Sequence, residues 1–122
     1  MSQSTTLILL PQTRYHNNGT SAPYDVTGEE VQAAGYYLGS QDLQTISFSF
    51  SEVTGTLEIE ASLATTPASG DWFKIYEITA NNVSNTNANL NSYTNLTGNF
   101  VYMRAKIKDF NNGVVEFVKV SY

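Results

Sequence analysis

Hydrophobic and polar residues alternate in two neighbouring segments, residues 44–51 and 56–64. A period of two is typical of a β-strand with one buried face and one solvated face. The inward residues are predicted to be Ile46, Phe48 and Phe50 in the first segment and Leu57, Ile59, Ala61 and Leu63 in the second. Glu52-Val53-Thr54-Gly55 lies between them and ends in a turn-favouring glycine. The two segments are therefore predicted to form a β-hairpin.

Two further apolar runs flank Asn111-Asn112-Gly113 near the end of the chain. Asn and Gly tolerate the positive φ values of tight hairpin turns, so we predict a second hairpin here. The first run has one apolar face, formed by Val101, Met103, Ala105 and Ile107. The second run is partly apolar on both faces, because Val114, Val118 and Val120 alternate with Val115, Phe117 and Lys119. Such a strand is expected inside a sheet with packing on each side.

Turn signals divide the rest of the chain into shorter segments. Residues 4–10, 36–39 and 71–79 are predicted strands. Residues 11–35 are irregular, and residues 29–34 within them could form one or two helical turns between a capping Thr27 and a terminating Gly35. Residues 80–98 are rich in Asn, which favours turns, so this segment is predicted to be a long connection.

Seven to nine short strands and no strong helix signal predict an all-β fold, an antiparallel β-sandwich. A jelly-roll or Greek-key topology is the preferred arrangement, and a small closed barrel is the alternative. A chain of 122 residues fits a single domain, residues 1–122. We expect residues 1–35 to be an N-terminal strand plus an irregular arm, and residues 36–122 to be the sandwich core with the Asn-rich connection at residues 80–99.

Composition narrows the classes of partner. The net charge of −5 and the lack of a Lys/Arg cluster argue against nucleic acid. The chain has no cysteine, which excludes disulfides and thiolate metal sites. No apolar stretch approaches the roughly 20 residues needed to span a bilayer. Leu7–Leu10 is too short for the core of a signal peptide, so we expect synthesis in the cytoplasm and no membrane partner.

The residues give no catalytic or cofactor pattern. His16 is the only histidine, and no nucleophile motif accompanies it. Glu58 and Glu60 share one face of one predicted strand, whereas a glycosidase needs carboxylates on opposite sides of a cleft. Asp71, or Asp109 beside Asn111 and Asn112, could supply oxygens to a weak calcium site, but turn chemistry is the favoured explanation. We therefore predict no enzyme activity, no cofactor and no metal site.

Aromatic residues with polar neighbours are the best binding signal in the sequence. Trp72, Tyr76 and Tyr102 fall on polar faces of predicted strands near Arg104, and Tyr36 and Tyr37 lie at a loop–strand junction. Flat rings bordered by hydrogen-bonding groups suit either sugar stacking or a protein interface. The alternative for Trp72 is that it closes one end of the sandwich core.

The second half of the chain resembles small β-sandwich virion structural proteins and fibre modules of tailed phages, of the type found in T4-like marine cyanophages. The similar segments are residues 54–59, 61–64, 71–73, 97–105 and 113–122, within a region that runs from about Ile46 to the C-terminus. The resemblance implies a non-enzymatic virion protein, a component of the capsid decoration, neck, tail or fibre. Its partners would be other copies of itself and other virion proteins.

Two further expectations concern contacts. The apolar Leu7, Ile8, Leu9 and Leu10 are a candidate assembly arm that would add to the sheet edge of a neighbour. The rival function is a carbohydrate-binding adhesion module that recognises host surface glycans through Trp72, Tyr76 or Tyr102.

Overall fold

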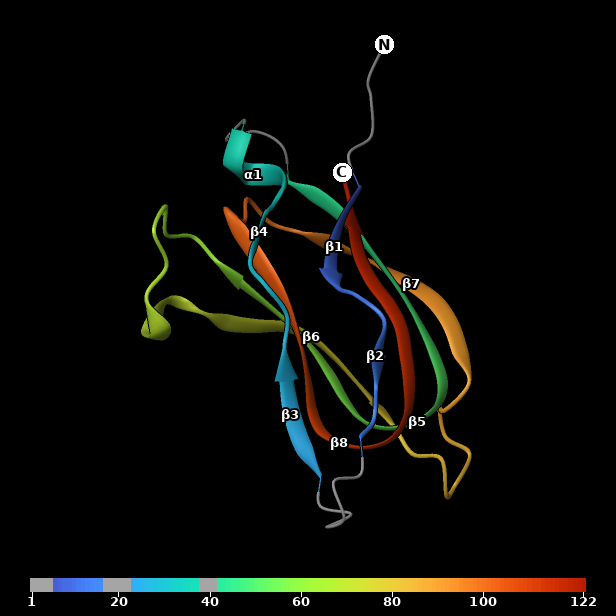
Figure 1. Cartoon of the computed structure of the whole chain (residues 1–122). Coiled ribbons are helices and arrows are strands. Elements are labelled where there is room, and N and C mark those ends of the chain that lie inside the picture. Colours follow the sequence, from blue (N-terminus) through green and yellow to red (C-terminus); the bar gives the residue numbers. More distant parts are fainter. Residues whose placement is uncertain (1–5, 17–22, 38–41) are drawn as a thin grey trace.

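The computed structural model of the chain describes residues 6–16, 23–37 and 42–122 (Figure 1). One antiparallel sheet of eight strands dominates it, which confirms the all-β prediction. The strands are β1 (Thr6–Leu10), β2 (Thr13–Arg14), β3 (Tyr24–Thr27), β4 (Val31–Gln32), β5 (Leu43–Ser62), β6 (Phe73–Ala80), β7 (Leu90–Thr97) and β8 (Tyr102–Ser121). Two short helical segments complete the chain, α1 (Ala34–Tyr37) and the 3₁₀ turn η1 (Ser69–Asp71).

The two long central strands, β5 and β8, have 20 residues each and pair along their whole length. The first half of β5 lies between β8 and β7, and its second half lies between β8 and β6. Both strands bend near their middle, so the two halves of the sheet face each other (Figure 1). The core fills the space between these halves and takes buried side chains from both.

The strand order is that of a jelly roll. One half of the sheet has the order β1/β2–β8–β5–β7, and the other has the order β3/β4–β8–β5–β6. If each half of β5 and of β8 counts as one strand, the eight segments form two linked Greek keys, as in a double-sheet jelly roll. Among the described residues β6 and β7 pair only with β5, so this pairing does not close a barrel.

Both predicted hairpins are wrong, because the chain bends at these points and does not reverse. β5 continues through Glu52 and β8 continues through Gly113, and the pairs Ser51↔Val114 and Thr54↔Asn112 keep the ladder together across the bends. Glu52, Asp109 and Gly113 have φ values of 56°, 55° and 85°. Positive φ values also serve bulges that bend a paired strand, and sequence alone does not separate the two uses.

The inward faces of the central strands agree with the predicted alternation. The buried side chains include Ile46, Phe48, Phe50, Leu57, Ile59, Ala61, Met103, Ala105 and Ile107. Two positions differ. Leu63 lies beyond the end of β5 and is 61% exposed. Val115, rather than Val114, is buried with Val118 and Val120, because the pairing shifts by one residue between Phe117 and Val115.

Three local predictions are wrong. Residues 29–34 contain strand β4, and the helix begins only at Ala34, so Gly35 lies inside it. Tyr36 belongs to α1 and not to a strand, while residues 38 and 39 lie outside the described part. The predicted connection at residues 80–98 contains the eight-residue strand β7. The Asn residues of the whole segment, two of them in β7, conceal its alternation of half-buried and exposed residues, because Asn is uncommon in strands.

A buried glutamine connects three secondary-structure elements at one end of the sheet. Gln44 is fully buried, and its amide nitrogen donates to the carbonyl oxygens of Asp42 (2.9 Å), Leu96 (3.1 Å) and Gly98 (3.3 Å). Its amide oxygen accepts from the backbone nitrogen of Ala34 at 3.3 Å. This side chain joins α1, the start of β5 and the end of β7, and its polar groups are satisfied without water.

We expect Gly113→Ala to lower the free energy of unfolding by at least about 2 kcal/mol. Gly113 has a positive φ, and a methyl group there would collide with the carbonyl oxygen of Glu52 on the facing bend. Gly70→Ala is the matched control, because its methyl group meets no described atom within 4 Å, and it should stay within about 0.5 kcal/mol of wild type. Urea denaturation measures both, and equal effects would show that the bend does not constrain the fold.

Candidate interaction surfaces

The outer face of the β3/β4–β8–β5–β6 half is densely charged, and we call it the charged face. Cross-strand neighbours pair Glu60 with Arg104 and Lys74, and Glu58 with Lys106 and Glu77. The charged residues of this face are Glu58, Glu60, Lys74, Glu77, Arg104, Lys106 and Lys108. Cross-strand pairs of opposite charge stabilise a sheet modestly and keep its face solvated.

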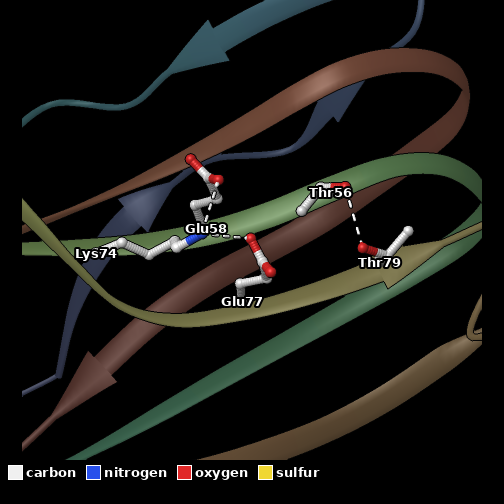
Figure 2. Close-up of polar contacts among 5 residues, drawn as sticks. All are labelled: Thr56, Glu58, Lys74, Glu77 and Thr79. Atoms are coloured by element: carbon white, nitrogen blue, oxygen red, sulfur yellow. Dashed lines mark hydrogen bonds and ion pairs between the residues drawn. The ribbon is translucent and has the colours of Figure 1, made fainter.

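Lys74 lies between two carboxylates of the charged face (Figure 2). Its Nζ is 2.7 Å from Glu77 Oε2 and 3.7 Å from Glu58 Oε2. The hydrogen bond to Glu77 raises the pKa of Lys74, and the same bond lowers the pKa of Glu77. Beside them the hydroxyl groups of Thr56 and Thr79 lie 3.2 Å apart. These contacts hold β6 to β5, and the charges of Lys74, Glu58 and Glu77 neutralise each other in part.

Trp72 and Arg104, two candidates from the sequence, contact each other. The guanidinium carbon of Arg104 lies 4.2 Å from the centre of the Trp72 ring, and Nε of Arg104 lies 2.8 Å from Glu60 Oε1. The arginine is thus held between an aromatic face and a carboxylate, which are two favourable contacts for a guanidinium group. One face of the indole is therefore already covered by a side chain of the same molecule.

Tyr102 and Tyr36 form a second aromatic pair. Their ring centres are 5.6 Å apart with an interplanar angle of 67°. Tyr102 and Arg104 are two residues apart on β8 and share a face, so Tyr36, Tyr102, Arg104 and Trp72 make one aromatic row at the end of the charged face. We call this the aromatic row. Tyr37, which follows Tyr36 at the predicted loop–strand junction, also belongs to α1.

Tyr76 is separated from the aromatic row. It lies opposite the buried Ile59, and its ring centre is 6.2 Å from that of Phe48. The pairing of β6 with β5 shifts between Ile59 and Glu60, which brings Lys74 to the outer face and Tyr76 to the inner face. Alternation along the sequence places the two residues on one face, and the bulge is the reason that they are not.

The candidate arm at Leu7–Leu10 is part of the sheet of its own chain. β1 pairs antiparallel with the end of β8, and Leu9 and Leu10 are buried in the core. Leu7 packs against the core, and Ile8 is 56% exposed. The segment expected to be an irregular arm likewise supplies β2, β3 and β4, which all pair with β8.

A groove lies between the two edges that these short strands form. It has a volume of about 500 Å³ and is lined by Ile8, Leu9, Leu10, Pro11, Thr13, Val26, Thr27, Gly28 and Glu29. Gly28 lies close to the backbone of Leu9 and donates to the carbonyl oxygen of Ala105 at 2.8 Å. Glu29 is the one ionisable residue of this lining.

The outer face of the other half has a different character, and sequence reasoning missed it as a unit. Thr45, Ser47 and Ser49 of β5 lie at its centre. Register places Asn91, Tyr93 and Asn95 of β7 on one side of them, and Phe117, Lys119 and Ser121 of β8, followed by Thr6 and Ile8 of β1, on the other. We call these eleven residues the serine-rich face. Lys119 is the only charged residue among these eleven, and its Nζ lies 4.5 Å from the centre of the Phe117 ring. Glu116 lies next to them at the end beside the bend, where its carboxylate accepts from Gln12 Nε2 at 2.8 Å and from Ser51 Oγ at 3.5 Å.

The two aspartates considered for calcium lie in different local structures. Asp71 Oδ2 accepts from the backbone N–H of Ala68 within a turn, at 2.8 Å. The backbone N–H of Asp109 donates to Asp25 Oδ1 at 2.9 Å, which joins β8 to β3. In the described ranges no group of three or more His, Asp or Glu residues is arranged to hold a metal ion. No helix in the same part of the chain is long and apolar enough to cross a membrane.

No protein-family model matches the chain, and no curated protein matches it either.

We expect Glu77→Gln to lower the urea midpoint near neutral pH and at low salt, because it removes the main partner of Lys74. The Glu77 pKa is lowered from 4.5, so the stability that this group contributes is present above 4.5 and is lost as the pH falls through the lowered pKa. The Lys74 pKa is raised from 10.5, so that contribution is lost only as the pH rises beyond 10.5. Wild type and variant should therefore converge at both extremes.

Urea midpoints measured across this pH range test that window. The exposed Glu30→Gln is the control for a change of one charge. A difference between wild type and Glu77→Gln that does not change with pH would contradict the ion-pair explanation, as would an equal effect of the control.

Proposed function

We propose that the protein is a non-enzymatic structural subunit of a tailed-phage virion, which works by self-association and by contacts with other virion proteins. The resemblance of its strand and turn segments to phage virion proteins suggests this class. The contrast between its two outer faces is the observation that carries the proposal, because it separates a surface suited to water from a surface suited to burial.

Burial of the charged face in an interface would be energetically unfavourable. Its seven charged side chains would lose their hydration in an interface. Three of them form the ion pairs of Lys74, and two more form the Arg104–Glu60 pair. Removing charges from water costs more than imperfect pairing returns. The centres of protein interfaces are accordingly depleted in charged residues. This face is therefore the outer, solvated surface of the subunit.

Burial of the serine-rich face would desolvate few charged groups. It has one charge among eleven residues, and short hydroxyl side chains that allow a neighbouring surface to approach closely. The carboxylate of Glu116 lies at the margin beside the bend, where Gln12 donates to it. Tyr93 and Ile8 are 67% and 56% exposed and supply apolar area. Three strand segments of about eight residues and the five-residue β1 cover roughly 450 Å² in projection. This flat projection is more than half of the roughly 800 Å² of accessible surface that each partner contributes to an ordinary protein interface.

The fold is compatible with this role without deciding it. Double-sheet jelly rolls occur in viral capsid proteins and also in lectins. A fold hosts many functions, and the surfaces carry the assignment.

The direct test is quantitative mass spectrometry of purified particles of the virus that encodes the protein. We expect the chain in a fixed copy number relative to the major capsid protein, retained after a salt wash. A protein found in the infected-cell lysate and missing from the particles would overturn the proposal.

A glycan-binding module is the second candidate, and the aromatic row favours it. Trp72 and Tyr102 are aromatic groups beside a guanidinium group, and this combination suits a sugar ring with its hydroxyl groups. On a glycan array, specific binding that disappears in Trp72→Ala and persists in Tyr93→Ala would support this function. Tyr93 is the control because it is exposed on the opposite outer face. Binding that neither substitution changes would count against the aromatic row.

A further inference from the structure

β7 is an edge strand without protection. Among the described residues it pairs with β5 alone, and it forms the outer margin of its half of the sheet (Figure 1). Its pairing runs from Leu90↔Phe50 to Thr97↔Leu43 without any shift of register. In an antiparallel ladder, alternate residues direct their N–H and C=O groups to the two sides. β7 therefore presents an uninterrupted row of backbone donors and acceptors along its free side.

The other edges of the described sheet carry the devices that discourage pairing with another chain. β1 and β3 are short and contain a bulge, and β2 and β4 have two residues each. β6 is as long as β7, but it has a bulge and carries Lys74 and Glu77. Short strands, bulges and charges protect natural sheet edges. β7 has eight residues, no bulge, no charge and no proline.

The sequence of β7 complements itself. Leu90-Asn91-Ser92-Tyr93-Thr94-Asn95-Leu96 has nearly the same residue chemistry in both directions from Tyr93. If two copies pair antiparallel about a two-fold axis at Tyr93, each Leu90 faces Leu96 of the other copy. Asn91 then faces Asn95, Ser92 faces Thr94, and the two Tyr93 residues face each other. Isologous contacts need this kind of self-complementary patch.

The side chains also agree in the direction that they face. Asn91, Tyr93 and Asn95 are exposed on the serine-rich face, whereas Leu90 and Leu96 pack against the core. The register centred on Tyr93 pairs outward residues with outward ones and leucines with leucines. A slip of two residues keeps the faces but pairs Leu96 with Ser92 and Tyr93 with Asn95, so the leucine contacts are lost.

We propose that a second copy of this chain pairs with the free edge of β7, in an antiparallel register centred on Tyr93. The inference deepens the proposed function, on whose self-association it rests, by naming the surface and the partner. The paired halves become one continuous sheet, and the two serine-rich faces become one surface twice as wide. We call the contact between the two β7 strands the seam. Each Lys119 lies on β8, and β5 separates β8 from the seam.

The charge distribution favours this seam between two acidic molecules. Each copy has a net charge of −5, so two copies repel each other in most orientations. None of the 11 acidic residues lies in β7. The seam therefore joins backbone groups, amides, hydroxyls, leucines and tyrosines, and no like charges face each other across it.

Single-cysteine cross-linking tests the register, because the wild-type chain has no cysteine. Tyr93 is 67% exposed, so Tyr93→Cys should fold normally. Opposed residues of antiparallel strands have Cβ atoms about 5 Å apart. We expect Tyr93→Cys to form a covalent dimer with mild oxidant or a short bis-maleimide. Asn91→Cys and Asn95→Cys are the matched controls and should stay monomeric on denaturing gels, because each faces the other position. Equal cross-linking of all three variants, or none in Tyr93→Cys, would overturn the proposal.

Charge variants test the contact in solution. Asn91→Glu with Asn95→Glu places two acids opposite each other at each end of the seam, and should raise the dimer dissociation constant at least about tenfold. Asn91→Lys with Asn95→Glu differs only in the sign of residue 91 and should retain the dimer. Both keep an acceptor for the Thr45 hydroxyl, which donates to Asn95 Oδ1 at 2.7 Å. Thr65→Glu with Thr66→Glu adds the same charge at an exposed loop and should leave the dimer unchanged.

Sedimentation equilibrium over a range of concentrations measures these constants, with circular dichroism to show that each variant is folded. A monomeric wild type, or an oligomer that the double glutamate variant does not weaken, would overturn the β7 contact. A monomeric wild type would also remove self-association from the proposed function, whereas membership of the virion is decided separately by the presence of the protein in purified particles. Absence from the particles would overturn that role while a β7 dimer still stood.

Discussion

The fold depends on two bends that occur at the same level in paired strands. β5 and β8 stay hydrogen-bonded over 20 residues, so neither can pass from one half of the sheet to the other unless its partner bends beside it. Gly113 permits this because its backbone lies directly against Glu52, and Asn112 Nδ2 donates to the carbonyl oxygen of Glu52 at 2.9 Å. Tyr15 also donates to the carbonyl oxygen of Gly113, at 2.9 Å, which ties the N-terminal edge to the same point.

The bends also divide the surface into two faces with different chemistry. Each long strand contributes to both, so one run of sequence changes its outward residues as it crosses the bend. β5 presents serine and threonine before Glu52 and presents Glu58 and Glu60 after it. β8 presents Arg104, Lys106 and Lys108 before Gly113 and presents Phe117 and Lys119 after it. Acids and bases from two strands thus meet along the whole of one face. The other face carries Lys119 and, at its end beside the bend, Glu116, whose carboxylate is hydrogen-bonded by Gln12.

Sequence patterns predicted what depends on neighbours along the chain and failed where distant strands decide. Ile46, Phe48 and Phe50 were placed inward because alternation alone sets the face of a strand. Turn and bulge share the same residues, so Asn111-Asn112-Gly113 was mistaken for a hairpin. The contact of Trp72 with Arg104, and the separation of Tyr76 from both, depend on how β6 and β8 register on β5 and on a bulge in β6. Pairing over such separations leaves no local signal.

β7 shows how a local sequence pattern can conceal a strand. Its Asn residues made it look like a connection, yet a charged strand would serve a self-pairing edge less well. Charges would repel the second copy, and Asn side chains opposite one another can exchange hydrogen bonds across the seam. Gln44 fixes the far end of β7 through the carbonyl oxygens of Leu96 and Gly98, and the strand stays paired in register with β5 up to its last residues. The uncharged composition that concealed the strand in the sequence is therefore the property that leaves its edge open to a partner.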